Sequence, residues 1–144
     1  MICVICEKQF TQVYDLWKHK KMKILKALFA ALFLFCVVLQ FNDPDPLLWI
    51  LVYGAMVVIS IMSIWHKYPT KVMVVMAAGY LVMTIIYFEG FQTWFNSPDR
   101  SLLFDDLAKM QYLYIEEARE FLGLLICLTV LIFYFYLAKR HSEK

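Results

Sequence analysis

The chain has 144 residues, 62% of them hydrophobic, and a formal net charge of +2. A hydrophobic share this high excludes an ordinary soluble globular domain, in which about half of the residues are apolar. The basic residues concentrate beside an apolar run instead of forming a separate basic face, so we expect no nucleic-acid partner.

The first 21 residues are polar and differ from the rest of the chain. Met22 is followed by a short basic stretch and then an apolar run, so our hypothesis is that translation begins at Met22 and that residues 1–21 are an over-long start.

Cys3, Cys6 and His19 have the spacing of a zinc finger up to its first histidine, but the second histidine is missing. Three ligands make a poor closed structural site, so we predict no zinc site in this segment, and we predict no cofactor.

Four apolar runs of 17 to 19 residues follow, at about residues 24–41, 47–65, 72–88 and 121–138. A helix needs roughly 20 apolar residues to cross the hydrocarbon core of a bilayer. The sequence therefore predicts an all-α fold, in which residues 22–144 form one integral membrane four-helix bundle in the lipid bilayer.

The charges between these runs are sorted by sign. If both termini lie on one side, that side carries 11 of the 14 Lys/Arg but only three of the 12 Asp/Glu. Basic residues gather in cytoplasmic loops, so we expect both termini in the cytoplasm. The lysines of residues 18–26 are interpreted as part of this orientation signal, beside anionic headgroups. The segments predicted on the non-cytoplasmic side of the membrane have too few cysteines for a disulfide framework, which favours a bacterial inner membrane.

Two connecting segments have recognisable patterns. Asp43-Pro44-Asp45-Pro46 predicts a tight outer turn, because each proline removes a backbone donor and disfavours helix in the residue before it. Residues 102–115 place apolar side chains close to a helical period, which predicts an amphipathic surface helix before the last span.

Polar side chains also recur at helical spacing inside the spans. Tyr53, Ser60 and Ser63 form one such line, and Tyr80 and Thr84 form another. These lines could border a ligand cavity or could join helices by hydrogen bonds. No span carries a charge at its middle, which argues against an ion pathway through the bundle.

Carboxylates collect at the outer end of the predicted bundle. Glu116 and Glu120 are four residues apart and share a helix face. Such a cluster could bind a divalent cation, could act as acid and base if crowding raises the pKa values, or could be solvated loop charge. The candidate residues for a ligand or cation are Asn42, Asp43, Asp45, Glu116, Glu117, Arg119 and Glu120.

Two stretches of the chain resemble the transmembrane protein 220 family. Residues 40–49 resemble its Q-x-N-D-P-D-P-x-x-W block, and residues 116–123 resemble its E-E-x-R-E-x-x-G block. The layout matches over about residues 22–140. The resemblance implies a small polytopic membrane protein of largely unknown biochemical function and supplies no catalytic residue. Both blocks fall on the same predicted face, so we expect the polar residues of the first to approach those of the second.

Three functions stay open. The first is a non-enzymatic membrane protein whose outer polar cluster stabilises the bundle or binds a small ligand or cation. The second is an accessory or assembly subunit with a membrane protein partner or a second copy of itself. The third is a membrane enzyme using the carboxylates. We prefer the first, because spacing identifies no nucleophile–base pair.

Overall fold

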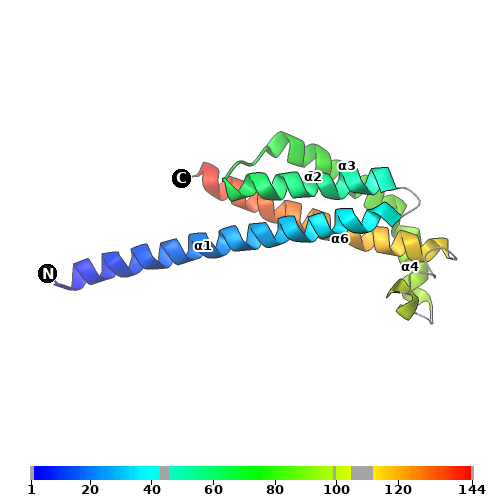
Figure 1. Cartoon of the computed structure of the whole chain (residues 1–144), viewed down its shortest axis with the longest axis horizontal. Helices are drawn as coiled ribbons and strands as arrows, with labels where there is room; N and C mark the ends of the chain where they lie inside the picture. Colours follow the sequence, from blue (N-terminus) through cyan, green and yellow to red (C-terminus); the bar gives the residue numbers. More distant parts are fainter. Residues whose placement is uncertain (1, 43–45, 99, 105–111, 144) are drawn as a thin grey trace. The chain divides into compact units, whose positions relative to one another are not determined.

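The computed structural model describes residues 2–42, 46–98, 100–104 and 112–143, with side chains from residue 20 onward apart from 42, 102 and 104. The described residues form helices and contain no strand, which confirms the all-α prediction (Figure 1). The chain divides into two compact units, Met1–Tyr68 and Pro69–Lys144. The helices are α1 Ile2–Leu39, η1 Gln40–Asn42, α2 Pro46–Ile64, α3 Thr70–Ile86, α4 Phe88–Asn96, η2 Arg100–Phe104 and α6 Leu113–Ser142.

Unit 1 is the pair of helices α1 and α2. They pack side by side, as the short predicted turn between them requires (Figure 1). Aromatic side chains fill the contact: the rings of Phe33 and Tyr53 stack with centroids 6.5 Å apart, and Trp49 lies 5.9 Å from Tyr53. All three are buried. Large apolar side chains cover the outward faces of both helices, an arrangement suited to lipid and not to water.

A Schellman motif ends α2. The backbone N–H of Lys67 donates to the carbonyl of Met62 at 3.1 Å, and that of His66 donates to the carbonyl of Ser63 at 3.0 Å. His66 has a φ of 58°, the left-handed conformation that this cap requires. The cap turns the chain sharply and places Tyr68 back beside the helix end.

Unit 2 is built on α6. The chain bends by 46° between α3 and α4, and both helices pack against α6. The helices Lys20–Leu39, Pro46–Ile64 and Leu113–Ser142 are each long and apolar enough to cross a membrane, and α3 with α4 gives a fourth if the bent pair is one span. The four predicted spans are therefore all found as helices, and the orientation of the termini stays a prediction.

The segment between α3 and α6 differs in detail from the sequence expectation. Residues 89–96, which follow the third predicted span, continue as the short helix α4. The last helix begins at Leu113, earlier than 121, so the second polar block is part of it. Half of the predicted surface helix, residues 105–111, lies outside the described residues, and its described beginning belongs to the 3₁₀ helix η2.

The polar lines inside the spans face inward. Tyr53, Ser60 and Ser63 are buried in α2, and Tyr80 and Thr84 are buried in α3. The hydroxyl of Ser63 donates to the carbonyl of Ser60, and that of Thr84 donates to the carbonyl of Tyr80, each at 2.7 Å. These two hydroxyls therefore satisfy their hydrogen-bonding capacity within their own helices.

Ser60 provides a test of the packing in α2. Its Oγ is buried and has no hydrogen-bond partner in the structure. A buried hydroxyl without a partner costs about 1–3 kcal/mol, so Ser60→Ala should keep or raise the thermal unfolding midpoint in detergent. Ser63→Ala is the matched control: it removes a hydroxyl that does donate, and should not raise the midpoint. A marked fall in the midpoint of Ser60→Ala would contradict this interpretation.

Candidate functional site

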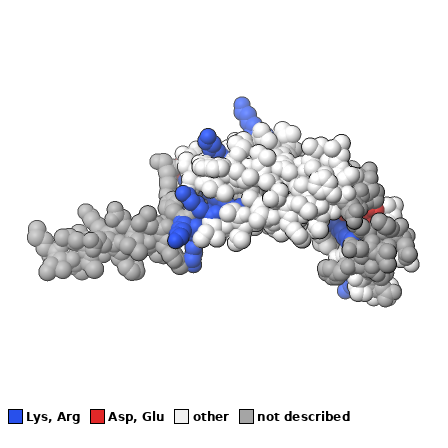
Figure 2. All heavy atoms as spheres, in the orientation of Figure 1, with Lys and Arg blue, Asp and Glu red and all other residues white. Residues whose placement is uncertain are grey.

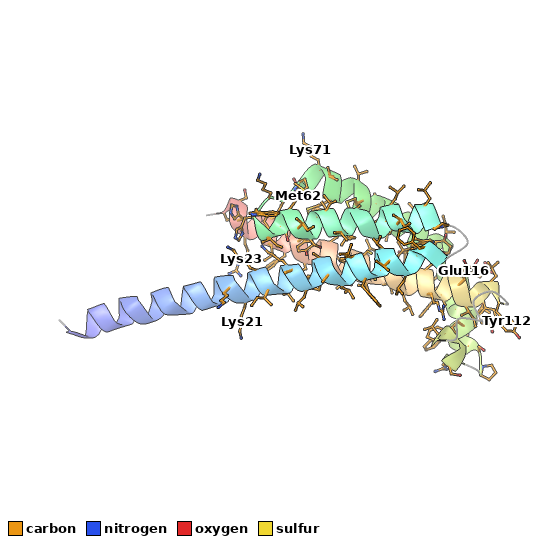
Figure 3. All side chains as sticks on the ribbon, viewed as in Figure 1. Lys21, Lys23, Met62, Lys71, Tyr112 and Glu116 are labelled. Carbon is orange, nitrogen blue, oxygen red and sulfur yellow. The ribbon has the colours of Figure 1, made fainter. Side chains whose placement is uncertain are left out.

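The first turns of α6 carry four of the predicted site residues, Glu116, Glu117, Arg119 and Glu120, which we call the polar cluster. The helix is held in place here by apolar side chains between the charges: Ile115, Ala118 and Leu124 are fully buried. The ring of Phe121 stacks on that of Phe91 from α4 with centroids 4.4 Å apart. Figure 3 shows Glu116 at the end of α6 that lies against α4.

Glu117 packs directly on a glycine of α4. Gly90 is buried, and a Cβ atom added to it would overlap both the Cβ and the carboxylate Oε2 of Glu117. The absence of a side chain at position 90 is therefore what lets α4 approach α6 so closely. This contact was not predicted from the sequence. No periodic pattern marks Gly90, because its role depends on a partner 27 positions away.

Arg119 joins α6 to η2 by a hydrogen bond. Its Nε–H donates a short hydrogen bond to the backbone carbonyl of Leu103 in η2. The carbonyls at the end of a short helix lack partners within it, and a guanidinium satisfies such a carbonyl with a charge-assisted bond. The turn between α4 and η2 is closed by Trp94, whose Nε1–H donates to the carbonyl of Arg100 at 3.2 Å.

The structure thus brings together the part of the predicted site that belongs to unit 2. Glu116, Glu117, Arg119 and Glu120 are all half-buried on one stretch of α6. Asn42 ends η1 and its side chain is not described; Asp43 and Asp45 lie outside the described residues. The expected approach of the two blocks stays a prediction. Among the described residues, no three His, Cys, Asp or Glu side chains gather as a metal-binding group.

Sequence analysis missed a buried lysine in unit 1. Lys26 is only 1% exposed, and its Nζ donates to the carbonyl of Ser63 at 2.7 Å and to the hydroxyl of Tyr68 at 2.8 Å. The same Nζ lies 5.3 Å from the centroid of the Tyr68 ring. We had interpreted Lys26 as one member of an orientation signal. Its position two residues inside an apolar run was the available sign that it differs from the lysines before it.

The environment of Lys26 suits a cation but contains no anion. The carbonyl of Ser63 belongs to the last turn of α2, where the helix dipole places partial negative charge. Both acceptors are neutral, and the described residues 20–42 and 46–68 of unit 1 contain no Asp or Glu. The ammonium therefore enters the helix pair without a carboxylate from residues 20–42 or 46–68.

Comparison with known protein families gives a match over most of the chain. The family model described as transmembrane family 220, helix, matches residues 32–136. This range contains both polar blocks and every predicted site residue, and it leaves out Lys26. No curated protein and no solved structure matches the chain.

Proposed function

Since this chain belongs to transmembrane family 220, we propose that it is a non-enzymatic multi-pass membrane protein whose polar cluster has two separate tasks. Glu117 and Arg119 stabilise the bundle by holding α4 and η2 against α6. Glu116 and Glu120 take part in binding a small ligand or cation. The observation that supports this division is the packing of Glu117 on Gly90 together with the bond from Arg119 to η2.

The binding task would draw on oxygen ligands from both family blocks. Glu116 and Glu120 are one helical turn apart on α6, so their carboxylates project from the same face. Asn42, Asp43 and Asp45 belong to the other block, on the same predicted side of the membrane. Hard divalent cations such as Ca²⁺ and Mg²⁺ prefer carboxylate and amide oxygens, which makes a divalent cation the ligand to test first.

A thermal unfolding experiment separates the two tasks. The protein, purified in mild detergent and stripped with a chelator, should show a higher unfolding midpoint when Ca²⁺, Mg²⁺ or Mn²⁺ is added, because a ligand stabilises the state that binds it. Asp43→Asn and Glu116→Gln should each reduce this cation-dependent rise. Glu117→Gln is the control: it keeps the side-chain shape that packs on Gly90 and should preserve both the starting midpoint and the rise.

Two results would overturn the cation proposal. One is that none of the three cations raises the midpoint of the unaltered protein. The other is that Asp43→Asn and Glu116→Gln leave the rise unchanged. If Glu117→Gln abolishes the rise while leaving the starting midpoint intact, the assignment of tasks within the cluster is reversed.

We also propose a bacterial inner membrane location with both termini in the cytoplasm, supported by the distribution of basic residues. A fluorescent protein joined after Lys144 should then fluoresce, and alkaline phosphatase joined at the same point should stay inactive. An active phosphatase fusion would contradict the orientation.

An accessory subunit of a membrane complex is the second candidate. It is favoured by α4, which exposes the rings of Phe88 and Phe95 to about half of their area although it packs against α6 on its other side. A membrane protein partner or a second copy of the chain could cover these rings. Native mass spectrometry after gentle release from the membrane should then show an additional chain, and a bare monomer would count against this candidate.

A further inference from the structure

Four lysines near the middle of α1 and one just after α2 form a group that we call the basic end. They are Lys20, Lys21, Lys23, Lys26 and Lys67. Figure 2, in which Lys and Arg are blue, shows basic side chains projecting near the beginning of the part of α1 whose side chains are described. Residues 20–42 and 46–68 of unit 1 contain no Asp or Glu, so the charge in this part of the unit is entirely positive.

The buried Lys26 gives the basic end a defined geometry. Its ammonium is fixed by Ser63 and Tyr68, the residues on either side of the Schellman turn that carries Lys67. Lys23 lies one helical turn before Lys26 on α1, close enough for their like charges to interact. The exposed Lys23 precedes the buried charge by one turn of α1, and the exposed Lys67 directly precedes its acceptor Tyr68 in the turn after α2.

Lys21 offers a natural contrast. It lies two positions before Lys23, so a helix directs it to a different side. Figure 3 shows Lys21 and Lys23 extending on opposite sides of α1. Both side chains are exposed and both carry the same charge. A ligand held by the geometry of the basic end should distinguish them, whereas general attraction to a charged surface should not.

An apolar stripe continues from the basic end along α2. Trp65, Ile61 and Val58 follow a helical spacing and are 65%, 39% and 56% exposed. A ligand that combined a phosphate with an acyl chain could place the phosphate at Lys67 and the chain along this stripe. A free phosphate would use only the lysines. The adjacency of charge and apolar surface thus favours a lipid over a soluble anion.

We propose that the basic end is a binding site for one anionic phospholipid, whose phosphate lies between Lys23 and Lys67 above the charge of Lys26. The headgroup supplies an anion beside residues 20–42 and 46–68, which contain no Asp or Glu, and a buried positive charge becomes more stable when an anion lies close to it. Basic pockets between membrane helices are known to hold anionic headgroups in this way. The site does not depend on which side of the membrane the basic end faces.

Lipid titration of the full chain tests this proposal. The delipidated protein in mild detergent is titrated with phosphatidylglycerol or phosphatidylcholine, and bound lipid is counted by native mass spectrometry. We expect phosphatidylglycerol to bind more tightly than phosphatidylcholine. Lys23→Gln and Lys67→Gln should together weaken phosphatidylglycerol binding by on the order of tenfold, since each removes one charge near the phosphate. Lys21→Gln should leave it unchanged.

The alternatives give different results. Equal losses in Lys21→Gln and Lys23→Gln would reveal general surface attraction and overturn the site. Equal affinity for the two lipids would also overturn it. Inorganic phosphate that displaces phosphatidylglycerol at similar concentration would show a soluble-anion site and would overturn the choice of a lipid. Unfolding midpoints in phosphatidylcholine should be equal for all variants, because these lysine side chains are exposed.

Discussion

Gly90→Ala is expected to destabilise unit 2, lowering its free energy of unfolding by about 1–3 kcal/mol, as overpacking of a close contact usually does. The new Cβ would occupy the space of the Cβ and carboxylate of Glu117, so α4 must move away from α6. The stacking of Phe91 on Phe121 would loosen with it. Unfolding in mixed detergent micelles measures the change.

Two other glycines provide matched controls. Nothing lies within 4 Å of a Cβ added at Gly79, in α3 of the same unit, or at Gly54, in α2. Alanine stabilises a helix interior by up to about 1 kcal/mol relative to glycine. Gly79→Ala and Gly54→Ala should therefore be neutral or slightly stabilising. A Gly90→Ala variant as stable as these two would show that α4 does not depend on the close contact.

A double-mutant cycle identifies Glu117 as the opposing residue. Glu117→Gly removes the Cβ that Gly90→Ala would meet, so combining the two moves the glycine from α4 to α6. The combined variant should recover much of the loss caused by Gly90→Ala, giving a clearly non-additive cycle. Additive losses would mean that the strain lies elsewhere.

Tyr68→Phe is expected to destabilise unit 1 by about 1–3 kcal/mol, because it removes an acceptor from the buried ammonium of Lys26 while leaving the charge in place. Lys26→Met removes the charge and retains a side chain of similar length. The smaller loss is expected for Lys26→Met, since buried ionic groups can often be replaced by apolar ones of similar volume at little cost.

The combination of the two substitutions is the decisive measurement. In Lys26→Met, the Tyr68 hydroxyl no longer accepts a hydrogen bond from the ammonium. Adding Tyr68→Phe should then lower the free energy of unfolding much less than it does in the unaltered protein. The unfolding free energies of the four proteins in detergent give the coupling between the two residues. If Tyr68→Phe lowers the free energy of unfolding equally with and without Lys26, the hydrogen bond between the two residues does not contribute to stability. The role assigned to Lys26 would then be wrong.

The sequence by itself determined the membrane character of the chain and the approximate position of its four apolar helices. Hydrophobic length is a local property, so the runs at 24–41 and 47–65 could be read directly as spans, and they became parts of α1 and α2. The two polar blocks likewise pointed to the family that the comparison supports over residues 32–136. The grouping of Glu116, Glu117, Arg119 and Glu120 followed from their closeness along one helix.

Only the tertiary structure decided what these residues contact. The sequence did not distinguish Glu117 from the carboxylates beside it, and the structure shows that it packs on Gly90. The sequence likewise did not distinguish Lys26 from the lysines before it. The structure shows that its ammonium donates hydrogen bonds to Ser63 and Tyr68. Both contacts join residues 27 or more positions apart. Periodicity tells which side of a helix is apolar, but it does not tell which residue on another helix meets a given side chain, because that depends on how the helices pack.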